Sequence, residues 1–287
     1  MRHIFHLFLL LLLLSLSACK GGRTSSEKPI LTVSIEPLRW VVSHIAGEDY
    51  EVTTLMPQGA SPETYEPTPR QMINLSQSEI LFSVGTMGFE QTRLRQMAAS
   101  SPELHLVELR EGITPIAEDG HHHGAVAESI DPHLWMSTQN LCLMARQVAR
   151  TLSTHQPARR AYYEERLNTT IAELEELDKQ LRSTLLHAPS RTFLIYHPAL
   201  GYMARQYGLV QLAVEHDGKE PSAASFQQLV NTCRSEEIKV AFVSKEHSGQ
   251  AARRIAGEVG ARIVEINPLA YDITQQMRLI AKSLTQE

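Results

Sequence analysis

One long segment without helix breakers most constrains the fold of this chain. Residues 156–187 contain no Gly, and their single Pro, Pro157, suits the first turn of a helix. Apolar side chains recur in it every three or four residues, at Tyr163, Leu167, Ile171, Leu174, Leu177, Leu181 and Leu185. This spacing predicts one continuous helix, roughly 40 Å long at about 1.5 Å per residue. A surface helix averages only about 11 to 12 residues, so we interpret the segment as a rigid strut that joins two lobes.

Short β-branched runs alternate with helical patterns on both sides of this segment. The first half has candidate strands at 31–35, 51–56, 80–84 and 105–109, with candidate helices at 37–46, 69–77 and 89–98. The second half repeats the pattern, with candidate strands at 193–196, 209–214, 240–244 and 262–266. Alternating strands and helices predict parallel sheets covered on both faces. The expected fold class is therefore α/β, with two lobes of parallel sheet flanked by helices and joined by one long rigid helix.

The N-terminus indicates an exported protein. A polar start with Arg2 precedes an apolar run at 7–14, and small residues then lead to Cys19. The run is shorter than the roughly 20 apolar residues that span a bilayer. Residues 1–18 resemble a bacterial lipoprotein signal, which predicts acylation of Cys19, and the alternative is a cleaved secretory peptide with an incidental cysteine. We expect lipid anchoring in the cell envelope, outside the cytoplasm and on the periplasmic side.

The rest of the chain then divides into four parts. Residues 19–28, rich in Gly, Ser and Thr, are expected to form a flexible tether. The predicted N-terminal lobe covers 29–155, the connecting helix 156–188 and the C-terminal lobe 189–287. About 260 residues can bury a sizeable core and commonly form two lobes.

Charge argues against nucleic acid as a partner. The chain has 27 basic and 32 acidic residues, and removal of residues 1–18 takes away Arg2 and no acid, which leaves a net charge of −6. No basic face is evident, although phosphate binding depends on one. Cys142 and Cys233 lie far apart in helical patterns, and neither belongs to a C-x-x-C pair. Buried thiols are favoured over a disulfide or a zinc site there, and we expect a monomer.

Several histidines and carboxylates follow candidate strands, where ligands bind in open α/β sheets. His197 comes directly after the run at 193–196, and His133 lies beside a proline in a turn that limits its freedom. In the other lobe, a proline-restricted loop after 51–56 carries Glu63 and Glu66. Imidazole and carboxylate are both zinc ligands, so these positions are candidate metal ligands.

Four motifs give the chain a resemblance that covers nearly all of its mature length. They are GASPETYEPTP at 59–69, DPHLW at 131–135, YHPALGY at 196–202 and NPL at 267–269. In these the chain resembles the metal-binding receptor lipoproteins that serve zinc or manganese ABC importers, the ZnuA and TroA-like family. The resemblance implies two α/β lobes joined by one long helix, with the metal between the lobes and an importer permease as partner.

The resemblance also implies ligand positions, with two departures. His133 and His197 match family ligands, whereas Glu63 stands where the family usually has histidine. A carboxylate oxygen is an acceptable zinc ligand, and the alternative is that Glu63 caps the next helix. The family's last carboxylate falls near Asn267, so the fourth ligand is open between Asp272, Glu246, His247 and water. Asp272 is nearest to that motif, and His216 and Glu220 are interpreted as structural or solvated.

A short histidine tract precedes the His133 motif. His121, His122 and His123 lie in a polar segment that resembles a reduced form of the histidine-rich loop of zinc-specific members, and short tracts of this kind bind metal by composition. We interpret the tract as an auxiliary site of weak metal capture. The alternative is a solvated loop with adventitious affinity. The tract favours Zn²⁺ over Mn²⁺ or Fe²⁺, since manganese prefers oxygen ligands.

These residues support more than one function. The favoured reading is a high-affinity zinc receptor that is not an enzyme and delivers its metal to an ABC importer permease. A manganese or iron receptor of the same family is the first alternative. A zinc metallohydrolase would use the same ligands with an open position, but no H-E-x-x-H helix or fixed general base is evident. An adhesin on the same scaffold is the remaining alternative.

Overall fold

The computed structural model describes residues 28–117, 130–216 and 218–286. The signal segment, Cys19, nearly all of the tether, and His121, His122 and His123 lie outside the described residues. The described part contains no helix that is both long and apolar enough to cross a membrane.

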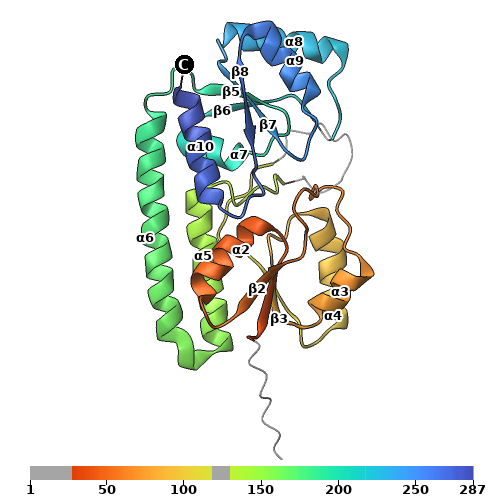
Figure 1. Cartoon of the computed structure of the whole chain (residues 1–287), viewed down its shortest axis with the longest axis vertical. Coiled ribbons are helices and arrows are strands. Elements are labelled where there is room, and N and C mark those ends of the chain that lie inside the picture. Colours follow the sequence, from red (N-terminus) through yellow and green to blue (C-terminus); the bar gives the residue numbers. More distant parts are fainter. Residues whose placement is uncertain (1–27, 118–129, 217, 287) are drawn as a thin grey trace, which may run out of the picture.

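Two parallel four-stranded sheets form the framework (Figure 1). The first contains β1 (Ile30–Val33), β2 (Glu51–Thr54), β3 (Ser78–Ser83) and β4 (His105–Glu108), in the order β2-β1-β3-β4. The second contains β5 (Thr192–Ile195), β6 (Val210–Ala213), β7 (Val240–Ser244) and β8 (Arg262–Ile266), in the equivalent order β6-β5-β7-β8. The predicted α/β class with two parallel sheets is confirmed.

Helices cover these sheets. In the first half they are α2 (Glu36–Ala46), α3 (Pro69–Leu75), a π-helical turn (Glu90–Leu94) that continues into α4 (Arg95–Ser100), and α5 (Thr138–His155). In the second half they are α7 (Gly201–Tyr207), α8 (Ala223–Ser235), α9 (Gln250–Val259) and α10 (Ile273–Thr285). Side-chain oxygens of Thr68, Ser137, Ser222 and Asp272 accept backbone N–H bonds at the starts of α3, α5, α8 and α10, as N-caps do.

The long joining helix is α6 (Arg160–Leu185), which has 26 residues and follows a 3₁₀ turn (Pro157–Arg159). The predicted helix therefore forms, but its first turn is 3₁₀ and it ends two residues earlier than expected. The α6 helix lies along one side of the molecule, packing against α5 and α2 beside the first sheet and against α10 beside the second (Figure 1). Its buried side chains include six of the seven apolar positions predicted from spacing, and Leu167 is half-buried.

Several side-chain contacts join the two halves. Trp135 is fully buried and its indole Nε1 donates to the Pro268 carbonyl at 2.8 Å. The Arg39 guanidinium of α2 lies over the Tyr271 ring, 4.3 Å from its centroid. One hydrophobic core contains buried residues from both sheets and from α5, α6 and α10. The two halves are therefore packed together and not only tethered.

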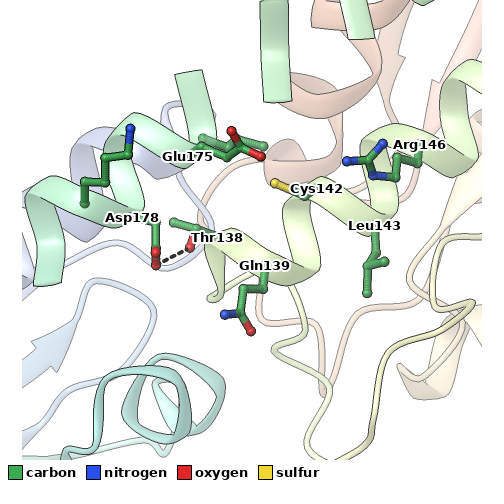
Figure 2. Close-up of a pocket in the computed structure, with 9 residues that line it drawn as sticks. Thr138, Gln139, Cys142, Leu143, Arg146, Glu175 and Asp178 are labelled. Atoms are coloured by element: carbon green, nitrogen blue, oxygen red, sulfur yellow. Dashed lines mark hydrogen bonds between the residues drawn. The ribbon is translucent and has the colours of Figure 1, made fainter. Parts of the chain in front are cut away.

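A cavity of about 470 Å³ lies between α5 and α6 (Figure 2). Its lining includes Cys142, Arg146 and Glu175, and Thr138 donates a hydrogen bond to Asp178 at its edge. None of the candidate metal ligands lines it. Within the described residues both cysteines are free, Cys233 buried and Cys142 half-buried, and burial raises the pKa of each thiol to about 11.

Burial along α6 generates a stability prediction. Leu177 is completely buried, so Leu177→Ala is expected to lower the free energy of unfolding by about 2–5 kcal/mol through lost burial and a residual cavity. Leu186, directly after the helix, is 79% exposed, and Leu186→Ala should change it by less than about 0.5 kcal/mol. Urea unfolding measures both. Equal losses in the two variants would show that the α6 interface does not contribute as described.

Candidate metal centre

His133 is fixed by the aspartate two residues before it. Its ring Nδ1 lies 2.8 Å from Asp131 Oδ1, and the same oxygen accepts the His133 backbone N–H at 2.9 Å. Both side chains are buried. A carboxylate on Nδ1 fixes the ring orientation and leaves Nε2 as the nitrogen available to a ligand, as in many metal sites.

His197 faces His133 from the second half of the molecule. It lies two residues beyond the end of β5, and its Nε2 is 3.3 Å from His133 Nε2. The same nitrogen is 3.0 Å from Glu63 Oε1, while Nδ1 lies 3.4 Å from Glu215 Oε1. His197 therefore lies within 3.3 Å of His133 and within 3.0 Å of Glu63, and a shared metal ion at these three side chains stays a prediction.

Glu63 reaches this point from the loop after β2. Its side chain is 40% exposed, the most exposed of the group. The alternative role as helix cap does not apply to α3, because Thr68 is the N-cap there and forms a capping box with Gln71. Glu66, the other carboxylate of the loop, pairs with Arg93 at 2.8 Å instead.

His247 joins the group from the loop after β7. Its ring stacks on that of His197, with centroids 4.6 Å apart and planes 14° from parallel. His247 Nδ1 lies 3.0 Å from Ser244 Oγ. Within the described residues, candidate ligand atoms of Glu63, His197 and His247 all lie within 4.8 Å of one another.

Hydrogen bonds elsewhere hold Asp272, Asn267 and Glu220. Asp272 is the N-cap of α10, where its Oδ1 accepts hydrogen bonds from Gln275 N and Thr274 Oγ1. Asn267 Oδ1 accepts from Leu269 N at 3.0 Å. Glu220 accepts a hydrogen bond from the Tyr196 hydroxyl at 2.8 Å, and the His216 backbone pairs with Lys219.

Charge in this cluster favours a cation. Burial alone would lower the pKa of the His197 imidazole, but the carboxylates of Glu215 and Glu63 raise it above its usual value. Burial also opposes ionisation of Glu215, yet His197 and His247 hold the pKa of its carboxyl below the ordinary range. Burial, followed by the charge on His197, lowers the pKa of His247. The cluster therefore accommodates positive charge at its centre, which a proton or a metal ion can supply.

Two partners of the histidines were not identified as such from the sequence. Asp131 stands out in the sequence only as part of the DPHLW motif, and Glu215 belongs to none of the four motifs. Glu215 lies two residues beyond β6, so the rule that ligands gather at the carboxyl ends of parallel strands could have indicated it. That rule also places His247, three residues beyond β7, next to His197, because β5 and β7 are neighbouring strands.

Asp131 is itself held from the second half of the molecule. The Tyr202 hydroxyl donates to the Asp131 carbonyl at 3.1 Å and accepts the Ile116 N–H at the same distance. The Asp131 carboxylate packs directly on Gly201, where an added Cβ would lie 2.4 Å from Oδ2. The first residue of α7 must therefore lack a side chain for Asp131 to support His133.

Comparisons with known proteins agree with this architecture. The family model for ZnuA, described as zinc-uptake complex component A, periplasmic, matches residues 31–285. The high-affinity zinc uptake system protein ZnuA of Bacillus subtilis (strain 168) is 28% identical over 278 residues, covering 91% of this chain and 85% of the relative. A crystal structure of ZnuA aligns with a TM-score of 0.84 and 33% identity, covering 90% of this chain and 98% of that one. A zinc-bound ZnuA deletion mutant aligns with a TM-score of 0.83 and 33% identity, covering 90% and 97%.

The contact between Gly201 and Asp131 generates a second prediction. Gly201→Ala should displace the Asp131 carboxylate and lower the free energy of unfolding by about 1–3 kcal/mol, as overpacking does. In Gly257→Ala, within α9, the new Cβ meets nothing within 4 Å, so this control should be stabilised by about 0.4–1 kcal/mol. Urea unfolding with a chelator present measures both without metal. A neutral Gly201→Ala would contradict the close packing.

Proposed function

Because the chain belongs to the ZnuA family of zinc-uptake components, we propose that it is an extracytoplasmic receptor that binds Zn²⁺ and delivers it to the permease of an ABC importer. One observation carries the proposal. His133 Nε2 and His197 Nε2, from opposite halves of the molecule, lie 3.3 Å apart, with Glu63 Oε1 3.0 Å from the latter. These separations are close to the ligand spacing of about 3.3 Å that zinc–nitrogen bonds of about 2.0–2.1 Å give in a tetrahedron.

The surrounding residues would prepare the two imidazoles for metal. Asp131 and Glu215 hold the Nδ1 atoms, so each Nε2 can offer its lone pair when the ring is neutral. Three carboxylates, those of Glu63, Asp131 and Glu215, carry more negative charge than one divalent ion offsets. The excess negative charge of these carboxylates favours binding of a cation. It disfavours the state in which no metal is bound and the histidines are neutral.

Zinc is favoured over manganese and iron by the donors present. Imidazole nitrogen suits zinc, whereas manganese sites are built mainly from carboxylate, carbonyl and water oxygens. Two imidazoles and one carboxylate in the inner set therefore support a zinc receptor. Delivery to a permease needs reversible binding. Glu63 is the most exposed of the candidate ligands, so movement of its loop would open the set while the two halves stay packed together.

We also propose that the mature protein is a monomer held at the membrane by a lipid on Cys19. The support is the order of the N-terminal segment, a charged start, an apolar run and small residues before the cysteine. Residues 19–28 would serve as the tether, which gives the receptor reach to its permease at the membrane surface. The periplasmic description of the matching family agrees with an extracytoplasmic location.

Loss of both central histidines tests the receptor proposal. The double variant His133→Ala/His197→Ala should lose more than about 100-fold in zinc affinity, since even an outer partner of a ligand is worth about 10–100-fold. Calorimetric zinc titration of the mature protein measures this. The matched control is His155→Ala/His187→Ala, which removes two exposed histidines and should keep the wild-type affinity and stoichiometry. Unchanged tight binding in the first variant would contradict the proposed site.

The histidine tract is proposed to capture metal weakly and to be dispensable for the central site. His121, His122 and His123 are flanked by Gly120 and Gly124, so coordination there requires ordering of the segment. Replacement of all three by Ser should remove a weak phase of zinc binding and leave the tight phase nearly intact, as read by the same titration. Growth should be impaired only when zinc is scarce, because the tract raises the local metal concentration. If the tight phase of zinc binding were lost in this variant, the tract would instead supply ligands directly to the central site.

A further inference from the structure

We propose that His247 is the fourth ligand of the metal, completing a closed set of three imidazole nitrogens and one carboxylate oxygen with Glu63, His133 and His197. This inference rests on the proposed function, since it concerns the same ion. The fourth donor atom would then be a nitrogen of His247 and not a carboxylate oxygen of Asp272. No coordination position of the ion would be left open.

The sheet topology brings His247 to the site. In the second sheet the strand order changes direction between β5 and β7, and ligands of open α/β sheets bind where such strands end. His197 and His247 follow these two neighbouring strands by two and three residues. Both side chains therefore begin at the same edge of the sheet, and their rings stack.

Each of the three histidines has a hydrogen-bond partner at its Nδ1 atom. Asp131 Oδ1 lies 2.8 Å from Nδ1 of His133, and Glu215 Oε1 lies 3.4 Å from Nδ1 of His197. The third partner is Ser244 Oγ, 3.0 Å from Nδ1 of His247. Since each Nδ1 has an outer partner, Nε2 is the remaining donor of every ring, which is the arrangement expected of three metal-binding imidazoles.

The loop that carries His247 has a shape that depends on a glycine. Gly249 adopts a left-handed conformation, with φ +60°, directly before α9. A Cβ there would lie 2.8 Å from Val243 Cγ1, so the turn packs closely on β7. The loop is thus held at both ends, by Ser244 and by Gly249, and presents His247 between them.

Asp272 is the strongest competitor for the fourth position. Its Oδ1 already accepts two hydrogen bonds at the start of α10, from Gln275 N and Thr274 Oγ1. Redirecting this carboxylate to a metal would give up a helix cap, which costs about 0.5–2 kcal/mol. His247 would give up no comparable interaction, because its bond to Ser244 uses Nδ1 and leaves Nε2 for the ion.

A closed set with three nitrogens has a consequence for selectivity. Four-coordinate sites without an open position are typical of zinc that is held and not used for catalysis. Manganese prefers oxygen donors and higher coordination. His247 should therefore increase the preference for zinc over manganese, and its loss should decrease that preference.

Two single variants of the full mature chain test the assignment. His247→Ala should keep one zinc per protein but weaken zinc binding by at least about tenfold, with a smaller loss for Mn²⁺. With Co²⁺ as a spectroscopic probe, the intense visible bands of tetrahedral nitrogen and oxygen coordination should weaken in this variant. The matched control is Asp272→Asn, which keeps a good N-cap but removes the competing carboxylate. It should bind zinc and Co²⁺ as the wild type does.

The outcomes separate this inference from the function on which it rests. Tight zinc binding by the wild type, with His247→Ala unchanged or with Asp272→Asn weakened instead, would overturn the role of His247 and leave the receptor proposal standing. Absence of tight binding in the wild type would overturn the receptor itself. Urea unfolding of both variants with chelator present verifies that any weakening comes from a lost ligand. Neither His247 nor Asp272 belongs to a hydrophobic core, so both changes should alter the free energy of unfolding by less than about 1 kcal/mol.

Discussion

Burial of one face of α6 is the interaction on which the rest of the structure depends. Each sheet alone could form a small α/β layer, but α6 packs on α5 and α2 with one part of its length and on α10 with another. Its buried leucines belong to a hydrophobic core that includes residues of both sheets. At roughly 1.5–3 kcal/mol for each fully buried large side chain, this face supplies enough free energy to fix the halves relative to each other. His133 and His197 come from different halves, so the distance between them is defined only because the two halves are fixed relative to each other.

The site depends next on two equivalent sheet orders. In both sheets the earliest strand lies inside, so the chain leaves adjacent strands in opposite directions and opens a crevice at their carboxyl ends. The second sheet places His197 and His247 there, while a loop from the first brings Glu63. Buried carboxylates behind the imidazoles then fix which nitrogen faces inward. The proposed metal site thus follows from sheet topology combined with a few buried hydrogen bonds.

The sheets and the joining helix could be predicted from the sequence because the periodicity of strands and helices is a local property. The approach of His133 to His197 could be predicted because each lies in a contiguous motif. The ends of elements were less predictable. The sequence predicts an α-helical start at Pro157, whereas the first turn is 3₁₀. It leaves the fourth ligand open between Asp272, Glu246, His247 and water. Asp272 and His247 are 25 residues apart in sequence and can be ranked only once β5 and β7 are known to be neighbours. Glu215 could not be recognised for the same reason, since its partnership with His197 is set by strand pairing and by no local spacing.

The packing of α10 on α6 has a consequence for the order in which the chain can fold. Gln180 of α6 accepts a hydrogen bond from Arg278, which lies 98 residues later in the chain. A polypeptide that emerges N-terminus first can complete the first sheet, α5 and the adjoining part of α6 early. The far part of α6 must wait, its apolar stripe uncovered, until the whole second sheet and α10 have followed. Until then this stripe is exposed apolar surface, which favours aggregation or binding by a chaperone.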